Sequence, residues 1–177
     1  MSRADPDPDA SATAARGRPA LVRRFEDEDT PAVIALAEEL RRFEAGLYGR
    51  MRVSGRLGRW YVEDLLADCA DTDGEILVAD IDGEVVGYVS VRARVTDEAR
   101  DRSQLTYAMV DDLIVSRAFR GRGIGRLLIK AAQDHARRKG ASFIRIGVLA
   151  SNRSAHDLYR RAGFADHLIM LEKPLDG

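Results

Sequence analysis

A glycine-rich loop between a strand and a helix constrains the fold of this chain more than any other feature. Residues 106–115 have a strand pattern, residues 117–126 read RAFRGRGIGR, and residues 123–139 carry apolar side chains at helical spacing. Three glycines in five positions let the backbone come close to a ligand, because no Cβ blocks the approach. The helix start then directs unpaired N–H groups and a positive dipole end at that ligand. The segment therefore predicts a strand–loop–helix unit that binds phosphate.

The arginines of this loop indicate a diphosphate. Four arginines lie among the ten residues 117–126, with no acidic residue between them, and they add cations to the backbone donors. The glycine spacing differs from the dinucleotide fingerprint G-x-G-x-x-G, and the Gly-Lys-Ser/Thr of a P-loop is absent. Taken alone, the loop also fits a basic turn that leads into a helix without binding a ligand.

The remaining elements predict a mixed α/β sheet in one domain. We expect strands over residues 21–25, 75–80, 84–94, 106–115, 142–149 and 164–173, and helices over residues 31–43, 58–68, 123–139 and 153–162. A length of 177 residues with 45% hydrophobic content suits a single core. Residues 1–19 are rich in Asp, Pro, Ala and Ser, which predicts a disordered tail before a domain at 20–177.

Charge and composition exclude several classes of partner. The chain has 28 basic and 29 acidic residues, so we expect no nucleic-acid partner. No apolar stretch approaches the ~18 residues of a membrane span, and no apolar run follows the N-terminus as in a secretory signal. The single cysteine, Cys69, fits a reducing cytosol. Neighbouring carboxylates would raise the pKa of its thiol, so we do not expect a nucleophile.

A second informative segment, residues 151–164, reads SNRSAHDLYRRAGF. Asn152 can cap the helix that follows, and Tyr159 lies seven residues on, about two turns along the same face. Both segments resemble signatures of the GNAT superfamily of N-acetyltransferases. The loop, preceded by the sequence DDLIV at 111–115, resembles the acetyl-CoA signature Arg/Gln-x-x-Gly-x-Gly/Ala. The second segment has every fixed position of Asn-x-x-Ala-x-x-x-Tyr-x-x-x-Gly-Phe.

This resemblance covers about residues 20–175 and implies a mostly antiparallel sheet, flanked by helices and splayed at the central ligand strand. It also implies that acetyl-CoA is the co-substrate. The main chain of Leu113 and Val115 would pair with the thioester and pantetheine arm, and the amides of residues 121–126 would bind the pyrophosphate. The expected acetyl-CoA contacts are Leu113, Ile114, Val115, Arg120, Gly121, Arg122, Gly123, Ile124, Gly125, Arg126, Asn152 and Ala155.

The chemistry requires an acid and a base. An amine attacks the acetyl carbonyl and a thiolate leaves, so a phenol near the sulfur can protonate it, which makes Tyr159 the candidate acid. The Leu113 amide would hold the oxyanion. Resemblance to polyamine-type members points to Asp111 as a base acting through water. On an alternating strand Asp111 and Asp112 would point to opposite faces. Asp112 could instead be buried, or both could attract a cationic substrate.

We therefore expect an acetyl-CoA-dependent N-acetyltransferase that acts on a primary amine, by direct attack in a ternary complex. We expect the acceptor to be a small molecule, and a protein lysine or N-terminus is the alternative acceptor. A non-catalytic acyl-CoA-binding module is the alternative function. Acceptor contacts are guessed at Glu44, Tyr48, Trp60 and Tyr107. The three histidines lack metal-ligand spacing, so no metal is expected. The resemblance also implies a homodimer, and the composition a cytoplasmic location.

Overall fold

Five strands form one sheet in the computed structural model, which describes residues 18–51, 53, 55–96 and 105–175. Their order in the sheet follows their order in the chain. The strands are β1 (Leu21–Arg24), β2 (Glu75–Ile81), β3 (Glu84–Thr96), β4 (Thr106–Val115) and β5 (Phe143–Ile146). Neighbours are antiparallel except β4 and β5, which are parallel. This confirms the expected mixed, mostly antiparallel sheet.

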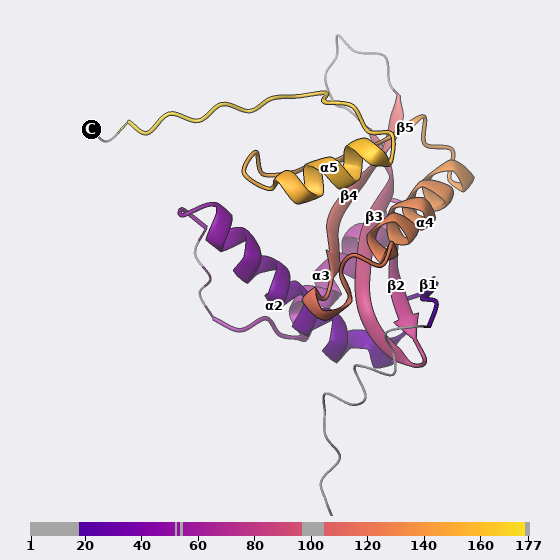
Figure 1. The fold of residues 1–177 in the computed structure, drawn as a ribbon. Helices are drawn as coiled ribbons and strands as arrows, with labels where there is room; N and C mark the ends of the chain where they lie inside the picture. The colour runs from indigo at the N-terminus through magenta and orange to yellow at the C-terminus, as the bar shows by residue number, and fades with distance from the viewer. Residues whose placement is uncertain (1–17, 52, 54, 97–104, 176–177) are drawn as a thin grey trace, which may run out of the picture.

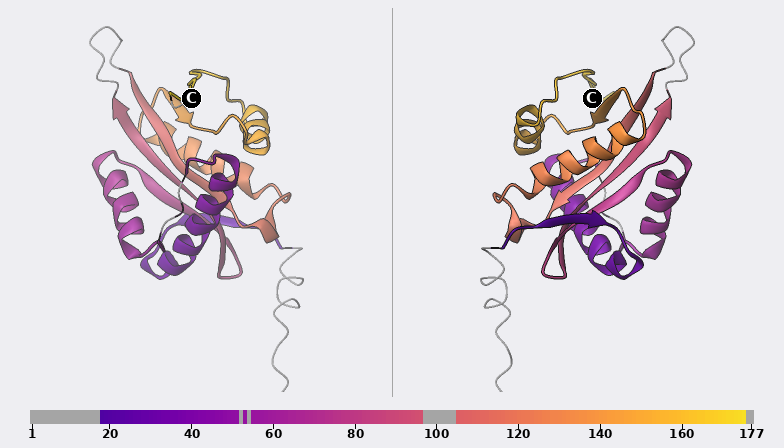
Figure 2. Two further views of the ribbon diagram at one scale, coloured as in Figure 1. Left: turned by 90° about the vertical axis from the view of Figure 1, so that its left-hand side faces the viewer. Right: turned by 90° about the vertical axis from the view of Figure 1, so that its right-hand side faces the viewer.

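Helices cover both faces of the sheet (Figures 1 and 2). They are α2 (Thr30–Leu47), α3 (Arg59–Asp71), α4 (Ile124–Arg138) and α5 (Arg153–Arg161), with short 3-10 turns η2 (Asp27–Asp29) and η3 (Arg117–Phe119). α2 and α3 pack on one face around Val33, Val62 and Tyr88. α4 packs on the other face against a cluster that includes Val110 and Leu128. The long apolar faces of these helices thus enclose the sheet between two cores.

The strand β4 carries a bulge at Asp111. Ser90 of β3 lies opposite Asp112, while the next residue of β3, Val91, lies opposite Val110. Asp111 is therefore an extra residue in the ladder, as in a β-bulge. The hydroxyl Oγ of buried Ser90 accepts the N–H of Asp112 at 3.0 Å, which satisfies a backbone donor that the bulge removes from the ladder.

The pairing of β4 with β5 stops halfway along β4. The parallel ladder runs from Tyr107 opposite Phe143 to Val110 opposite Ile146, where β5 ends. β4 continues to Val115. In the described part of the chain, no strand pairs with this side of β4 beyond Val110. This confirms the expected splay at the ligand strand.

The strand predicted over residues 164–173 is absent. The backbone there is assigned to no helix or strand up to Leu171 and beyond, although the composition favours a strand. A strand needs a partner edge, and the segment pairs with none of the strands that the structure describes. The predicted tail at 1–19 lies outside the described residues except for Arg18 and Pro19. No helix in the described ranges has the length and apolar content to cross a membrane.

Candidate functional site

The predicted loop adopts a backbone conformation that requires glycine. Gly121 and Gly123 have φ of +79° and +80°, in the left-handed region that other residues rarely adopt. Gly123 is the N-cap of α4, so the first N–H groups of that helix face out of the loop. A Cβ at Gly125 would lie 3.1 Å from Leu158 Cδ2, which shows why this position is small: α4 and α5 approach closely there.

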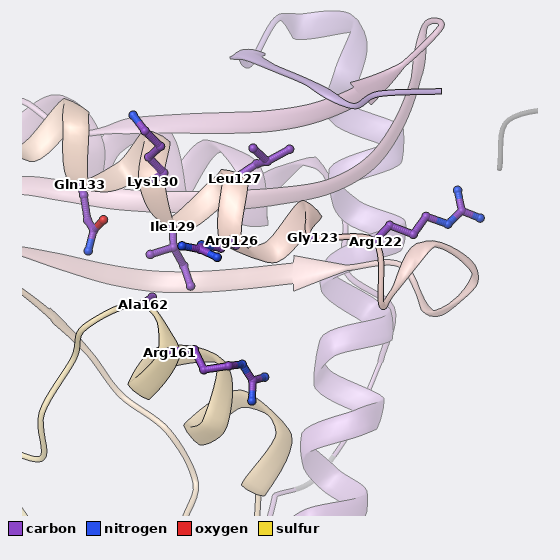
Figure 3. A pocket seen from close by; sticks show the side chains of 9 residues that line it. All are labelled: Arg122, Gly123, Arg126, Leu127, Ile129, Lys130, Gln133, Arg161 and Ala162. Carbon is purple, nitrogen blue, oxygen red and sulfur yellow. The ribbon is translucent and has the colours of Figure 1, made fainter. Parts of the chain in front are cut away.

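A pocket of about 460 Å³ opens between α4 and the end of α5 (Figure 3). It is lined by Arg122, Gly123, Arg126, Leu127, Ile129, Lys130, Gln133, Arg161 and Ala162. Four of these side chains are cationic and none is acidic, which suits a ligand with several phosphate groups. Lys130 is paired with Asp134 at 2.5 Å, so the three arginines carry the excess charge.

One lining arginine has a buried nitrogen for which the described residues supply no hydrogen-bond acceptor. Arg122 stacks on Phe119, with its guanidinium carbon 4.9 Å from the ring centroid. Its Nη1 is buried and has no hydrogen-bond partner among the described residues. A buried guanidinium nitrogen without an acceptor is costly unless a ligand supplies one. Binding of phosphate groups in this pocket stays a prediction.

Sequence reasoning found part of this pocket and missed the rest. The predicted contacts Arg122, Gly123 and Arg126 line it. Lys130, Gln133 and Arg161 were not predicted. The first two lie four and seven residues after Arg126, so helical periodicity could have found them.

The predicted contact Arg120 lies outside this lining. Its Nε donates to Val115 O at 2.9 Å, and its Nη2 donates to Glu39 Oε1 at 3.1 Å. Arg120 therefore connects the end of β4 to α2. A direct contact of Arg120 with acetyl-CoA stays a prediction.

The second signature builds the other wall of the site. Asn152 caps α5, and its Oδ1 accepts the N–H of Ala155 at 3.2 Å. Two turns later Tyr159 is 7% exposed and packs against Phe164. Burial, with a smaller contribution from the charge of Glu44, raises the pKa of Tyr159 to about 12. The phenol is therefore protonated at neutral pH and has a proton to donate.

The carboxylates of Asp111 and Asp112 lie on the same face of the sheet, so the prediction of opposite faces is wrong. The carboxylate of Asp112 accepts hydrogen bonds from the hydroxyls of Tyr61, on α3, and Tyr88. Asp111 also lies on the α3 side, where its charge helps raise the pKa of the Cys69 thiol. The bulge at Asp111 interrupts the alternation on which the prediction relied.

These two carboxylates have different partners. Both oxygens of Asp111 are bound by Arg92, Oδ2 by Nε at 2.9 Å and Oδ1 by Nη2 at 2.7 Å. Asp112 is held by two tyrosines, and burial raises the pKa of each phenol, with the Asp112 charge second. The phenols therefore stay protonated and donate. Asp112 is thus held by hydrogen bonds from two phenols, whereas Asp111 is engaged in an ion pair with Arg92.

Glu44 joins the two halves of the site. It lies on α2, is partly buried, and its pKa is raised by burial and then by the charge of Asp112. The same side chain helps raise the pKa of Tyr159, so it lies within electrostatic reach of both groups. The sequence suggests Glu44 only as an acceptor contact. Glu44 continues the buried apolar face of α2 that Val33, Ala37 and Leu40 form. A carboxylate on such an apolar face is the sequence feature that could have indicated a functional role.

The other guessed acceptor contacts are not brought together. Tyr48 donates to Glu172 at 2.7 Å. Trp60 is exposed and lies edge-on to Tyr61. Tyr107 stacks on Phe143 under the guanidinium of Arg145.

Two further sequence expectations can be compared with the structure. Burial, followed by the charge of Asp111, raises the pKa of the Cys69 thiol to about 11, so the thiol is protonated and poorly suited to be a nucleophile. Carboxylates were expected to raise this pKa, and burial proves to be the larger cause. Within the described residues, no three or more His, Cys, Asp or Glu side chains form a group that could hold a metal ion.

Known sequences resemble this chain over much of its length. An uncharacterized N-acetyltransferase of Methanocaldococcus jannaschii is 32% identical over 108 residues, covering 61% of this chain and 45% of that protein. Streptothricin acetyltransferase of Streptomyces lavendulae is 35% identical over 100 residues, covering 56% and 49%. An aminoglycoside N(6')-acetyltransferase of Stenotrophomonas maltophilia is 28% identical over 129 residues, covering 68% and 84%. The chain spans about half the length of the first two relatives.

Solved structures share the fold. A mutant protein of Bacillus halodurans superposes with a TM-score of 0.78 at 21% identity, covering 88% of this chain and 99% of that one. An aminoglycoside N-acetyltransferase solved in complex with CoA gives 0.64 at 18% identity, covering 87% and 99%. The sequence model of the acetyltransferase (GNAT) family matches residues 32–164, which include α4, the splayed β4 and α5. The chain therefore belongs to the acetyltransferase (GNAT) family.

Proposed function

We propose that the protein is an acetyl-CoA-dependent N-acetyltransferase that acts on the primary amine of a small molecule. The observation that carries the proposal is the open edge of β4 beyond Val110, which leads to the cationic pocket between α4 and α5. An extended ligand arm can pair with such an edge as a substitute strand, while phosphates bind at the helix start. Acetyl-CoA combines both chemistries in one molecule.

The residues fit the parts of acetyl-CoA in order. The amides of residues 121–126 and the cations of Arg122, Arg126 and Arg161 would hold its phosphate groups. The main chain of Leu113 and Val115 would pair with the pantetheine arm and the thioester. This arrangement would bring the acetyl group near Tyr159 and Glu44. Asn152 and Ala155 would support that wall through the cap of α5.

The reaction needs two proton transfers. The amine nitrogen forms a bond to the acetyl carbon and the carbon–sulfur bond breaks, in one ternary complex. The Leu113 amide would stabilise the oxyanion, and Tyr159 would give its proton to the departing sulfur.

For the base we favour Glu44 over Asp111. A carboxylate of raised pKa accepts a proton more readily than an ordinary one. Asp111 could act only after breaking its two contacts with Arg92. Asp112 would then attract the ammonium form of the substrate without itself taking the proton, because both tyrosines already bind it.

The choice of a small-molecule acceptor rests on the relatives. Streptothricin and aminoglycoside acetyltransferases are among the proteins that this chain resembles. The partly buried acidic cluster of Glu44 and Asp112 favours a cationic amine. A protein lysine or N-terminus is the alternative acceptor.

The test is a turnover screen with acetyl-CoA, read as release of free thiol, over aminoglycosides, streptothricin, polyamines, amino acids and lysine peptides. We expect one of the cationic small molecules to give the largest kcat/KM. Larger kcat/KM on peptides would move the assignment to a protein acceptor. Binding of acetyl-CoA without turnover on any acceptor would favour a non-catalytic acyl-CoA-binding module.

A further inference from the structure

Arg41 is a partly buried cation on the inward side of α2. It lies four residues after the buried Ala37 and three before Glu44, and side chains at these spacings share one side of a helix. The next residue, Arg42, is exposed. Burial removes water from a guanidinium, and a bound anion can replace the lost hydration. Arg41 is therefore placed to bind an anion close to Glu44.

The described residues supply no anion for Arg41. Ion pairs form readily between helix residues three positions apart, and Glu38 and Glu44 lie at this spacing on either side of Arg41. The carboxylate of Glu38 instead accepts the N–H of Leu57 at 3.1 Å. In the part of the chain that the structure describes, Arg41 makes no hydrogen bond or ion pair with either glutamate or with any other residue. A ligand can therefore bind this guanidinium without first breaking a contact to those residues.

The charge of Arg41 acts on the groups that surround the proposed acceptor position. Tyr61 donates its hydroxyl to Asp112. Burial is the main cause that raises the pKa of Tyr61, the charge of Asp112 adds to it, and the charge of Arg41 opposes it. Glu44 lies within electrostatic reach of the same Asp112. Two carboxylates and one cation that forms no ion pair with a described residue thus lie together on this side of the sheet.

We propose that Arg41 binds a carboxylate of the acceptor, so that the N-acetyltransferase proposed above selects basic amino acids. The amine of the acceptor would lie between Glu44 and Asp112, and its carboxylate at Arg41. A guanidinium matches a carboxylate with two parallel hydrogen bonds. A basic amino acid has two amines and one carboxylate, which complement two carboxylates and one guanidinium. A phosphate suits the site less well, because its second negative charge would lie beside the two carboxylates.

The experiment compares two pairs of acceptors that differ in the carboxylate, lysine with lysinamide and ornithine with ornithinamide. Thiol release gives kcat/KM for the wild type, Arg41→Gln, Arg41→Lys and the control Arg42→Gln, which removes an exposed charge from the next position of the same helix. The measured quantity is the ratio of kcat/KM for the amino acid to that for its amide. Dividing the ratio of one protein by that of another cancels differences in amine reactivity. The four proteins should have closely similar Tm, because neither arginine makes a hydrogen bond or ion pair with a described residue.

We expect the ratio in the wild type and in Arg42→Gln to be about tenfold higher than in Arg41→Gln for at least one pair, the effect of one charge-assisted contact. The loss in Arg41→Gln should appear mainly as a higher KM for the amino acid, because the contact holds a part of the acceptor that does not react. Arg41→Lys should keep part of the preference, because it keeps the charge but loses the paired donors.

A ratio that Arg41→Gln leaves unchanged in both pairs would overturn the role of Arg41 and leave the acetyltransferase function in place. Turnover of polyamines or aminoglycosides without turnover of either amino acid would have the same meaning. If no acceptor in the wider screen is acetylated, the proposed function fails, and the role of Arg41 fails with it.

Discussion

Replacing Tyr159 by Phe tests the central chemical assignment with little disturbance of the fold. The ring is buried and packs against Phe164 with centroids 6.0 Å apart, and phenylalanine keeps that packing. Removal of the hydroxyl should therefore change the free energy of unfolding by about 1 kcal/mol or less. A general acid contributes ~10²–10⁴-fold to a rate, which is about 2.7–5.4 kcal/mol of transition-state stabilisation.

The pKa of Tyr159 makes the expected loss nearly independent of pH. With a pKa of about 12, roughly one phenol in 10⁴ is ionised at pH 8. The donor is therefore fully protonated over the range in which the enzyme can be assayed. We expect kcat of the Phe variant to fall ~10²–10⁴-fold by the same factor at pH 6.5 and pH 9.

The assay is thiol release at saturating acetyl-CoA, with the acetyl-CoA Kd measured separately by calorimetry. The Kd should stay within about twofold of the wild type, because the phenol acts on the leaving sulfur and adds little to ground-state binding. A kcat within about threefold of the wild type, at unchanged Tm, would refute the assignment of Tyr159 as the acid. A large rise in Kd with unchanged kcat would make Tyr159 a binding residue.

Three further perturbations test the base, the phosphate pocket and the fold. Glu44→Gln should lower kcat ~10²-fold or more. It should also remove the rise of kcat/KM with pH that follows the raised pKa of Glu44, whereas Asp111→Asn should keep that rise. If Asp111→Asn removes the rise and Glu44→Gln keeps it, Asp111 is the base. Arg161→Ala should raise the acetyl-CoA Kd about tenfold, the effect of one charge-assisted contact, whereas Arg160→Ala outside the pocket should not, as calorimetry would show. Asp29→Asn should lower the free energy of unfolding by ~1.5–3 kcal/mol at pH 7, as measured by urea denaturation. The reason is that Asp29 is 6% exposed and accepts two hydrogen bonds from Arg23. The Arg23 guanidinium lowers the pKa of Asp29 below its ordinary value of 3.8. The stabilisation by Asp29 is therefore present above about pH 3.8 and is lost as the pH falls through the pKa of the folded state. In acid, the wild type and Asp29→Asn should then have the same free energy of unfolding.

Local spacing explains what could be predicted from the sequence. The left-handed Gly121 and Gly123, the cap at Asn152 and the position of Tyr159 all depend on residues a few positions apart. Such short-range patterns determine the loop and the ends of the helices without knowledge of distant contacts. The loop of the proposed phosphate site was therefore predictable. Lys130 and Gln133 would have followed from the helical period, whereas Arg161 comes from another helix and could not be reached in this way.

Long-range pairing explains what could not be predicted. The carboxylate of Asp112 meets Tyr61 from a helix 51 positions earlier and Tyr88 from a neighbouring strand. That cluster depends on the register of β3 against β4, and a single bulge changes the facing of every residue around it. The apolar run at 168–171 has the composition of a strand, but the sequence does not reveal that it pairs with no strand of the described sheet.

The bulge at Asp111 separates two parts of β4 that differ in their pairing with β5. An added residue lengthens the edge of β4 that faces β3, and a strand lengthened on one edge must bend toward the other side. The bulge lies one residue after Val110, where the ladder with β5 ends. The inserted residue thus lies between the part of β4 that pairs with β5, up to Val110, and the part beyond it that has no strand partner on that side among the described residues. We expect a chain without it to extend its ladder with β5 and to lose the edge that we propose for acetyl-CoA.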